Sequence, residues 1–239
     1  MKKKIQNLLV LTIITFVFSS CLTILDEFNT SDPVIDFNNV WDDKNVYLND
    51  EVILENDTLK IKKLQYVISK ILLISDYDTI LVKDYDLIKL NNSYSGRRIT
   101  VDNVPNNTYK IVFTFGLENI DDDYYDLNAQ NFNNLDNGYY FLKLEADYKQ
   151  DTENMKYHIA KTLNTNYINS YKIEIEGFKI GSLFVNQAII NVNLKNLFLN
   201  PNIINIDNLN PSVIQDSILQ TKMMENAKNI FYLDRFSYD

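Results

Sequence analysis

Very few side chains of this sequence could act as a thiol nucleophile or as a soft metal ligand. Cys21 is the only cysteine, His158 is the only histidine, and the sulfur donors after the first residue are Met155, Met223 and Met224. A metal site built from several histidines is therefore excluded within one chain. His158 remains the candidate metal ligand, and a structural or surface role is the competing interpretation of this residue.

Patterns that support catalysis are also missing from the sequence. There is no Gly-x-Ser-x-Gly motif around a serine nucleophile and no glycine-rich phosphate loop. Pairs of carboxylates abound in an acidic protein, so they do not indicate glycoside hydrolysis. We therefore expect no catalytic residues and no enzymatic activity.

An acidic segment at residues 121–126, with the sequence DDDYYD, concentrates the oxygen ligands that Ca²⁺ prefers. Its spacing differs from the Asp-x-Asp-x-Asp-Gly pattern of an EF-hand loop. A solvated acidic loop is therefore the preferred interpretation over a calcium site.

The N-terminus has the organisation of a secretory signal. Three lysines at positions 2–4 precede an apolar run of about eleven residues at 8–18, and small residues follow at positions 19 and 20. A membrane-spanning helix needs about 20 apolar residues, so this run is too short for a stable span. We predict a cleavable signal peptide at residues 1–20 and an exported mature chain.

Cys21 directly follows this signal, and the arrangement resembles the lipobox of bacterial lipoproteins, with Phe18 in place of the usual leucine. We predict that the thiol of Cys21 is lipidated and that residues 21–32 form a tether. Acyl chains contribute about 0.8 kcal/mol per buried methylene, and two chains suffice for firm attachment. The expected location is the bacterial cell envelope, with the membrane as partner through the lipid anchor.

Net charge narrows the range of further partners. Removing residues 1–20 takes away three lysines, which changes the formal charge from −9 to −12. Nucleic-acid binding needs clustered Lys and Arg, and binding to anionic head groups needs basic segments. The composition therefore excludes both as expected partners and leaves any protein partner unidentified.

The mature chain is predicted to form one all-β domain at residues 33–234. No Pro/Gly/Ser-rich linker divides it, and several segments alternate between apolar and polar residues. Such runs, rich in Tyr, Phe, Ile and Val, favour an antiparallel β-sandwich, with Trp41 as a packing residue at a sheet end. The predicted strands are 34–40, 59–74, 109–115, 138–148, 170–180 and 187–199.

A helix is predicted at residues 213–231. Ile214, Ile218, Leu219 and Met223 recur there at helical spacing, with Ser212 as a candidate N-cap. Its apolar face is expected to pack against the sandwich.

Six short segments occur in a fixed order along the chain and resemble motifs of the MbnP-like family, which takes its name from a periplasmic copper-binding protein associated with methanobactin. The segment 138–145, for example, is similar to the family strand Gly-Tyr-Ile-Phe-Leu-Lys-Leu-Glu. The six segments are 64–73 (LQYVISKILL), 84–88 (DYDLI), 103–109 (NVPNNTY), 113–118 (FTFGLE), 138–145 (GYYFLKLE) and 157–159 (YHI).

The resemblance implies a secreted β-sandwich that binds copper through histidine and an oxidised tryptophan. The segment 131–138 (NFNNLDNG) lacks both tryptophans that relatives carry there, and 37–39 (FNN) lacks the family histidine. His158 is the recurrent histidine that remains. Two hypotheses follow: a non-enzymatic copper-binding lipoprotein, or a structural or partner-binding surface lipoprotein that has lost the metal site.

Overall fold

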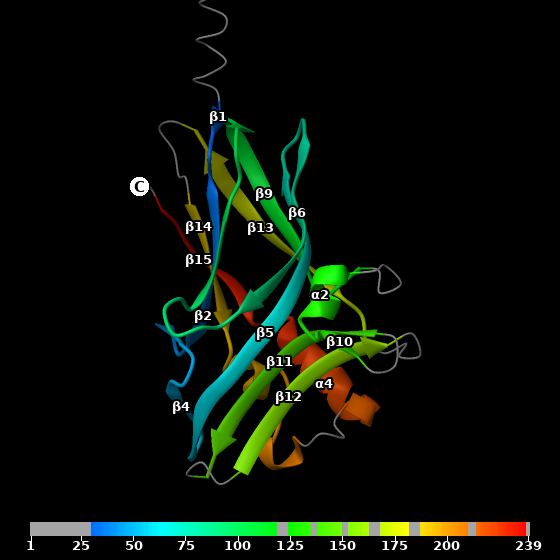
Figure 1. The fold of residues 1–239 in the computed structure, drawn as a ribbon. Coiled ribbons are helices and arrows are strands. Elements are labelled where there is room, and N and C mark those ends of the chain that lie inside the picture. Colours follow the sequence, from blue (N-terminus) through cyan, green and yellow to red (C-terminus); the bar gives the residue numbers. More distant parts are fainter. Residues whose placement is uncertain are drawn as a thin grey trace, which may run out of the picture.

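The computed structural model describes residues 30–118, 124–134, 138–149, 153–162, 168–181, 187–209 and 214–237. Within them, two sheets face each other in a sandwich, with a helix near the C-terminus (Figure 1). The predicted fold class is therefore confirmed. The first strand, β1 (Thr30–Ser31), includes two residues of the expected tether, and the last, β15, ends at Ser237.

The larger sheet is organised around one long strand, β5. On one side β5 pairs with β4 and β6, and on the other with β9 and β11; β10, β12 and β13 extend the sheet. All of these pairs are antiparallel. The strands are β4 (Glu51–Leu54), β5 (Asp57–Ile74), β6 (Thr79–Lys89), β9 (Asn107–Phe115), β10 (Asn133–Asn134), β11 (Gly138–Tyr148), β12 (Glu153–Thr162) and β13 (Tyr171–Ile180).

The smaller sheet contains β2 at its centre. Its pairing with β14 is parallel, which departs from the purely antiparallel expectation, while its pairs with β3 and β7 are antiparallel. The strands are β2 (Val34–Trp41), β3 (Lys44–Asn45), β7 (Gly96–Thr100), β14 (Gln187–Asn193) and β15 (Phe231–Ser237). Separately, β1 pairs with β8 (Val104–Pro105).

Aromatic side chains from both sheets fill the space between them. Phe37 on β2 meets the Phe113 ring on β9 edge-on at a centroid distance of 5.1 Å. Phe231 on β15 lies 5.2 Å from Phe113 and 5.7 Å from Phe115. Edge-to-face pairs of this kind add about 0.5–1.5 kcal/mol each beyond the area that they bury. Aromatic rings from both sheets therefore contact one another within a core that also contains many buried aliphatic side chains.

Gly116 allows β9 and β11 to approach closely. Its φ is +88°, and a Cβ there would lie 2.5 Å from ring carbons of Phe141. Its carbonyl accepts a 2.7 Å hydrogen bond from the hydroxyl of Ser69 on β5. Only glycine meets both the left-handed backbone and the tight contact without strain.

The predicted helix at 213–231 is wrong at both ends. The helix α4 covers Ser217–Ala227, and Phe231 begins the strand β15. Asp216 is the N-cap, accepting bonds from Ile218 N at 3.1 Å and Leu219 N at 2.9 Å. The predicted N-cap, Ser212, lies outside the described residues. Across the described part of the chain, no helix has the length and apolar character needed to cross a membrane.

The predicted strand at 187–199 is too long. β14 ends at Asn193, whose side-chain oxygen accepts a hydrogen bond from Lys195 N at 3.2 Å. The short helix α3 (Asn196–Leu199) follows, and a 3₁₀ helix covers Ile206–Asn208. This local side-chain bond offers the backbone an alternative to the sheet ladder, which ends the strand.

Candidate functional site

The candidate ligand His158 lies on β12 beside two charged residues of β11. In the antiparallel pairing, Lys143 stands opposite His158, and Glu145 is two residues further along β11. The Nε2 atom of His158 lies 3.1 Å from Oε1 of Glu145. The side chains of His158 and Glu145 are 14% and 25% exposed. The imidazole is thus hydrogen-bonded in a largely covered position.

Glu145 is held in its charged form. Its hydrogen bond with His158, together with the ammonium of Lys63 on β5 at 3.4 Å, lowers the pKa of the Glu145 carboxyl to about 2 against the opposing effect of burial. Hydrogen bonding to a carboxylate and a nearby positive charge both favour ionisation. Glu145 therefore remains a carboxylate throughout the physiological range.

Lys143 completes this group of side chains. Its Nζ donates to the carbonyl oxygen of Asn131 at 2.7 Å and lies 3.9 Å from the centre of the Tyr140 ring. Burial, and then repulsion by Lys63, lower the pKa of the Lys143 ammonium to about 8. The edge-on contact of Tyr140 with His158, 5.5 Å between centroids, closes the other side of the imidazole.

The thioether groups lie on the other side of β12. Met155 and Tyr157 are fully buried, and they alternate with the partly exposed Lys156 and His158 along the strand. The Tyr157 hydroxyl lies 3.3 Å from the carbonyl oxygen of Met223 in α4. The side chains of Met155 and His158 therefore point to opposite faces of β12, as alternation along a strand requires.

The helix α4 does pack against β12, but through the core side of the strand. Gln220 Nε2 donates to the carbonyl oxygen of His158 at 2.7 Å, and it approaches the sulfur of Met223 at 3.6 Å. Met223 and Met224 are both buried. These two methionines of α4 are thus buried, whereas the side chain of His158 lies on the partly exposed face of β12.

A copper site of the usual kind does not fit this arrangement of donors. Such sites combine several nitrogen or sulfur ligands in a geometry that the fold fixes. Every histidine and methionine after Met1 lies in the described residues, and the imidazole faces away from the thioethers. Within the described ranges, no group of three His, Cys, Asp or Glu side chains could hold a metal ion.

The other candidate residues have simpler positions. Trp41 is buried, its Nε1 donates to the carbonyl oxygen of Ile53 at 3.0 Å, and its ring packs on Phe198 of α3 at 6.0 Å. It is therefore a packing residue. Cys21 and residues 121–123 of the acidic segment lie outside the described residues. Asp126 of that segment belongs to the short helix α2 (Tyr125–Ala129).

Sequence reasoning did not single out Lys63, Lys143, Glu145 or Gln220 as neighbours of His158. Lys143 and Glu145 were visible only as part of the segment 138–145. The signal that could have found them is the β11–β12 hairpin, because its register sets Lys143 opposite His158. That register changes at the irregularity between Tyr140 and Leu142, which the sequence does not reveal.

The two facing sheets, organised around the long β5, define a β-sandwich with a helix near its C-terminus. The family model described as MbnP matches residues 30–216, and the chain belongs to this family. Among solved structures, MbnP from Methylosinus trichosporium is similar, with a TM-score of 0.51 and 11% identity over 73% of this chain and 79% of that one. At this identity the likeness concerns the fold alone. No curated protein matches the chain.

Proposed function

We propose that this protein is a non-enzymatic lipoprotein of the bacterial envelope, anchored through Cys21, that uses its MbnP sandwich to bind a partner rather than to hold copper in a multi-ligand site. One observation carries the proposal. The imidazole of His158 is committed to Glu145 at 3.1 Å and covered by Tyr140, while Met155 is buried on the opposite face of β12. A copper ion at His158 would therefore have to displace a charge-assisted hydrogen bond and find its other ligands elsewhere.

The second candidate function is copper binding, which the family membership favours. His158 and the Glu145 carboxylate together would offer one nitrogen and one oxygen ligand. An imidazole with a carboxylate is a weak, unselective site for copper when no third ligand is fixed by the fold. This alternative requires a rearrangement of β12, α4 or both.

Calorimetric titration of the protein with copper, in both oxidation states, separates the two functions. We expect the wild type to bind copper no more tightly than an isolated surface imidazole, with the residual heat lost in His158→Ala. Lys156→Ala is the matched control, because Lys156 also lies on β12 and is partly exposed. Tight stoichiometric binding that His158→Ala removes and Lys156→Ala retains would establish the copper function instead.

Lipid attachment is tested separately by labelling cells with a traceable fatty acid. The wild type and Ser20→Ala, which keeps a small residue before the cysteine, are expected to incorporate label. Cys21→Ser is expected to incorporate none and to accumulate as the precursor, because only the thiol can form the thioether. Equal label in Cys21→Ser and wild type would refute the anchor.

A further inference from the structure

The turn between β5 and β6 presents the most exposed large side chain among the described hydrophobic residues. Tyr77 is 90% exposed, and Leu81, early in β6, is 55% exposed. The turn itself is well ordered by hydrogen bonds: Ser75 N donates to the carbonyl oxygen of Asp78 at 2.8 Å, and Asp78 N donates to the Ser75 hydroxyl at 3.1 Å. Tyr77 is thus held outward on a stiff support instead of folding back onto the sheet.

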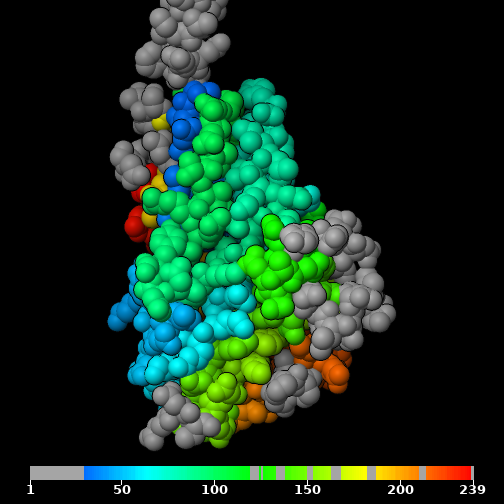
Figure 2. Space-filling model, viewed as in Figure 1, coloured from blue at the N-terminus to red at the C-terminus, as the bar shows by residue number. Residues whose placement is uncertain are grey.

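This turn lies at the end of the molecule where the described chain begins. Thr30 pairs with Pro105, and the carbonyl oxygen of Pro105 accepts a 2.9 Å hydrogen bond from the Tyr109 hydroxyl. Thr79, next to Asp78, pairs with Ile74 of β5, and Ile74 pairs in turn with Lys110, the neighbour of Tyr109. Figures 1 and 2 show β1 and the β5–β6 hairpin reaching the same end.

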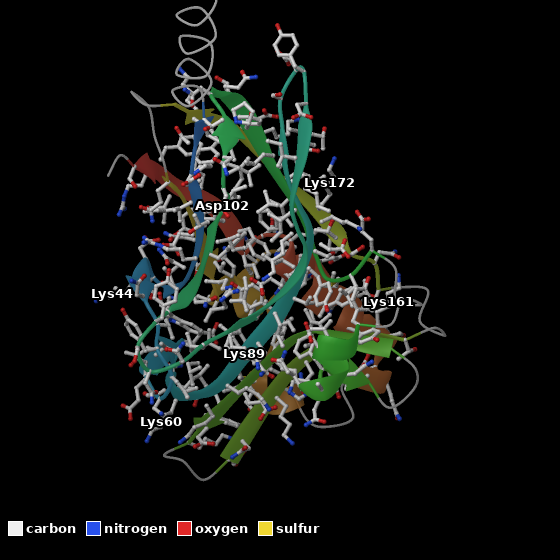
Figure 3. The ribbon with its side chains drawn as sticks, turned by 45° about the horizontal axis from the view of Figure 1, so that its top comes forward. Lys44, Lys60, Lys89, Asp102, Lys161 and Lys172 are labelled. Atoms are coloured by element: carbon white, nitrogen blue, oxygen red, sulfur yellow. The ribbon has the colours of Figure 1, made fainter. Side chains whose placement is uncertain are left out.

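The end of the molecule where β5 begins lies far from the β5–β6 turn. The first residue of β5, Asp57, lines a groove with Ile203, and Ile203 is 76% exposed. The 18 residues of β5 span about 55–60 Å at the usual rise of a strand. Figure 3 labels Lys60, near the start of β5, and Asp102, just before β8, toward different ends of the molecule. A second exposed apolar position therefore lies at the end away from Thr30.

The distance from Cys21 to Thr30 limits which end can stay near a membrane. Residues 22–29 can span at most about 26–29 Å even when fully extended. A lipid on Cys21 therefore keeps the Thr30 end, with Tyr77, close to the bilayer surface. The Ile203 end has no such constraint and can extend away from the membrane.

The side chains at the turn are suited to one kind of lipid surface. Tyrosine, with an apolar ring and a polar hydroxyl, favours the interface between lipid and water. Asp76 and Asp78 flank Tyr77, and both are exposed. Their carboxylates would be repelled by anionic head groups, whereas the ammonium group of a zwitterionic head group can pair with them.

We propose that the β5–β6 turn is a membrane contact: Tyr77 enters the head-group layer of a zwitterionic lipid surface, while Asp76 and Asp78 pair with head-group ammonium groups. This inference rests on the lipid anchor proposed at Cys21. It orients the domain with the turn toward the bilayer and the Ile203 end away from it.

Tryptophan fluorescence tests the orientation directly. Tyr77→Trp and Ile203→Trp place reporters at two exposed positions at opposite ends, each compared with the wild type to subtract the buried Trp41. On vesicles of phosphatidylethanolamine and phosphatidylcholine, Tyr77→Trp is expected to shift to shorter wavelength and to be quenched several-fold more by head-group spin-labelled lipid than Ile203→Trp. Phosphatidylglycerol in the vesicles is expected to reduce this difference. Equal quenching of the two reporters, or none at Tyr77→Trp, would overturn the orientation.

A chemically anchored sample separates this inference from the anchor itself. Cys21 is the only thiol of the full chain, so it can be coupled to a maleimide lipid in the same vesicles. Selective quenching of Tyr77→Trp in this sample supports the orientation even if fatty-acid labelling in cells fails, in which case only the anchor is refuted. Absence of selective quenching in the coupled sample refutes the orientation whether or not cells acylate Cys21.

Discussion

Gln220 of α4 donates a 2.7 Å hydrogen bond from its Nε2 to the carbonyl oxygen of His158 on β12. Its Oε1 accepts from Ala160 N at 3.3 Å, and the side chain is fully buried. One amide side chain thus forms hydrogen bonds with a backbone carbonyl and a backbone N–H group on the edge of β12 that faces away from β11. Gln220 takes the place of a neighbouring strand there and fixes the helix against the candidate site.

Gln220→Leu should therefore destabilise the protein markedly. The substitution keeps a similar volume but leaves His158 O and Ala160 N buried without partners, and each such group costs about 1–3 kcal/mol. We expect a loss of about 2–4 kcal/mol in the free energy of unfolding, measured by urea denaturation. Thr221→Ala, next along α4, should change it by less than about 0.5 kcal/mol. A similar loss in both variants would contradict the role of Gln220.

The acid stability of the protein should depend on Glu145. Its folded-state pKa, about 2, lies below the ordinary value of 4.5, so the unfolded chain binds more protons between these values. The stabilisation by Glu145 is therefore present above pH about 4.5 and is lost as pH falls toward 2. In Glu145→Gln, the midpoint of unfolding should therefore fall less steeply than in the wild type as the pH decreases across this range. A pH profile unchanged from wild type would exclude this contribution, and the exposed Glu51→Gln serves as control.

The positions of six strands could be predicted, because alternation of side chains is a local property of the sequence, whereas β6 and β12 were not predicted. The segment 59–74 lies within β5, and 138–148 coincides with β11. β15 could not be predicted in this way. Phe231 continues the helical spacing of the residues before it, yet its backbone pairs with Val192 of β14, far away in the sequence. Such pairing is decided by tertiary packing, which overrides local periodicity.

The candidate site was predictable only in part, for a related reason. The alternation of successive side chains along a strand is enough to place His158 and Met155 on opposite faces of one strand. The partners of His158 come from other strands: Glu145 from β11, with Lys63 from β5 behind it. Which residues meet across strands depends on register, and irregularities between Tyr140 and Leu142 and between Glu145 and Ala146 shift that register.

Lys143 should make the stability of the protein depend on pH in the alkaline range as well. Burial lowers its folded-state pKa to about 8 from 10.5, so the unfolded chain binds more protons between these values. Stability should therefore rise with pH from about 8, until tyrosines that ionise more readily in the unfolded chain reverse the trend near pH 10. Thermal unfolding midpoints between these limits should rise in wild type and in the exposed Lys44→Met, but not in Lys143→Met. An equal rise in Lys143→Met would show that another group is responsible.

Gly116 and Gly177 form a matched pair that separates backbone strain from crowding. Both have positive φ, +88° and +82°, but a Cβ at Gly116 would lie 2.5 Å from the Phe141 ring, whereas nothing lies within 4 Å of one at Gly177. Gly177→Ala should cost about 1–2 kcal/mol for the left-handed backbone alone. Gly116→Ala carries the same strain and must also displace the fully buried Phe141, which adds about 1–3 kcal/mol. Denaturant unfolding of the two variants measures this difference, and equal losses would mean that β9 and β11 can separate at Gly116 without cost.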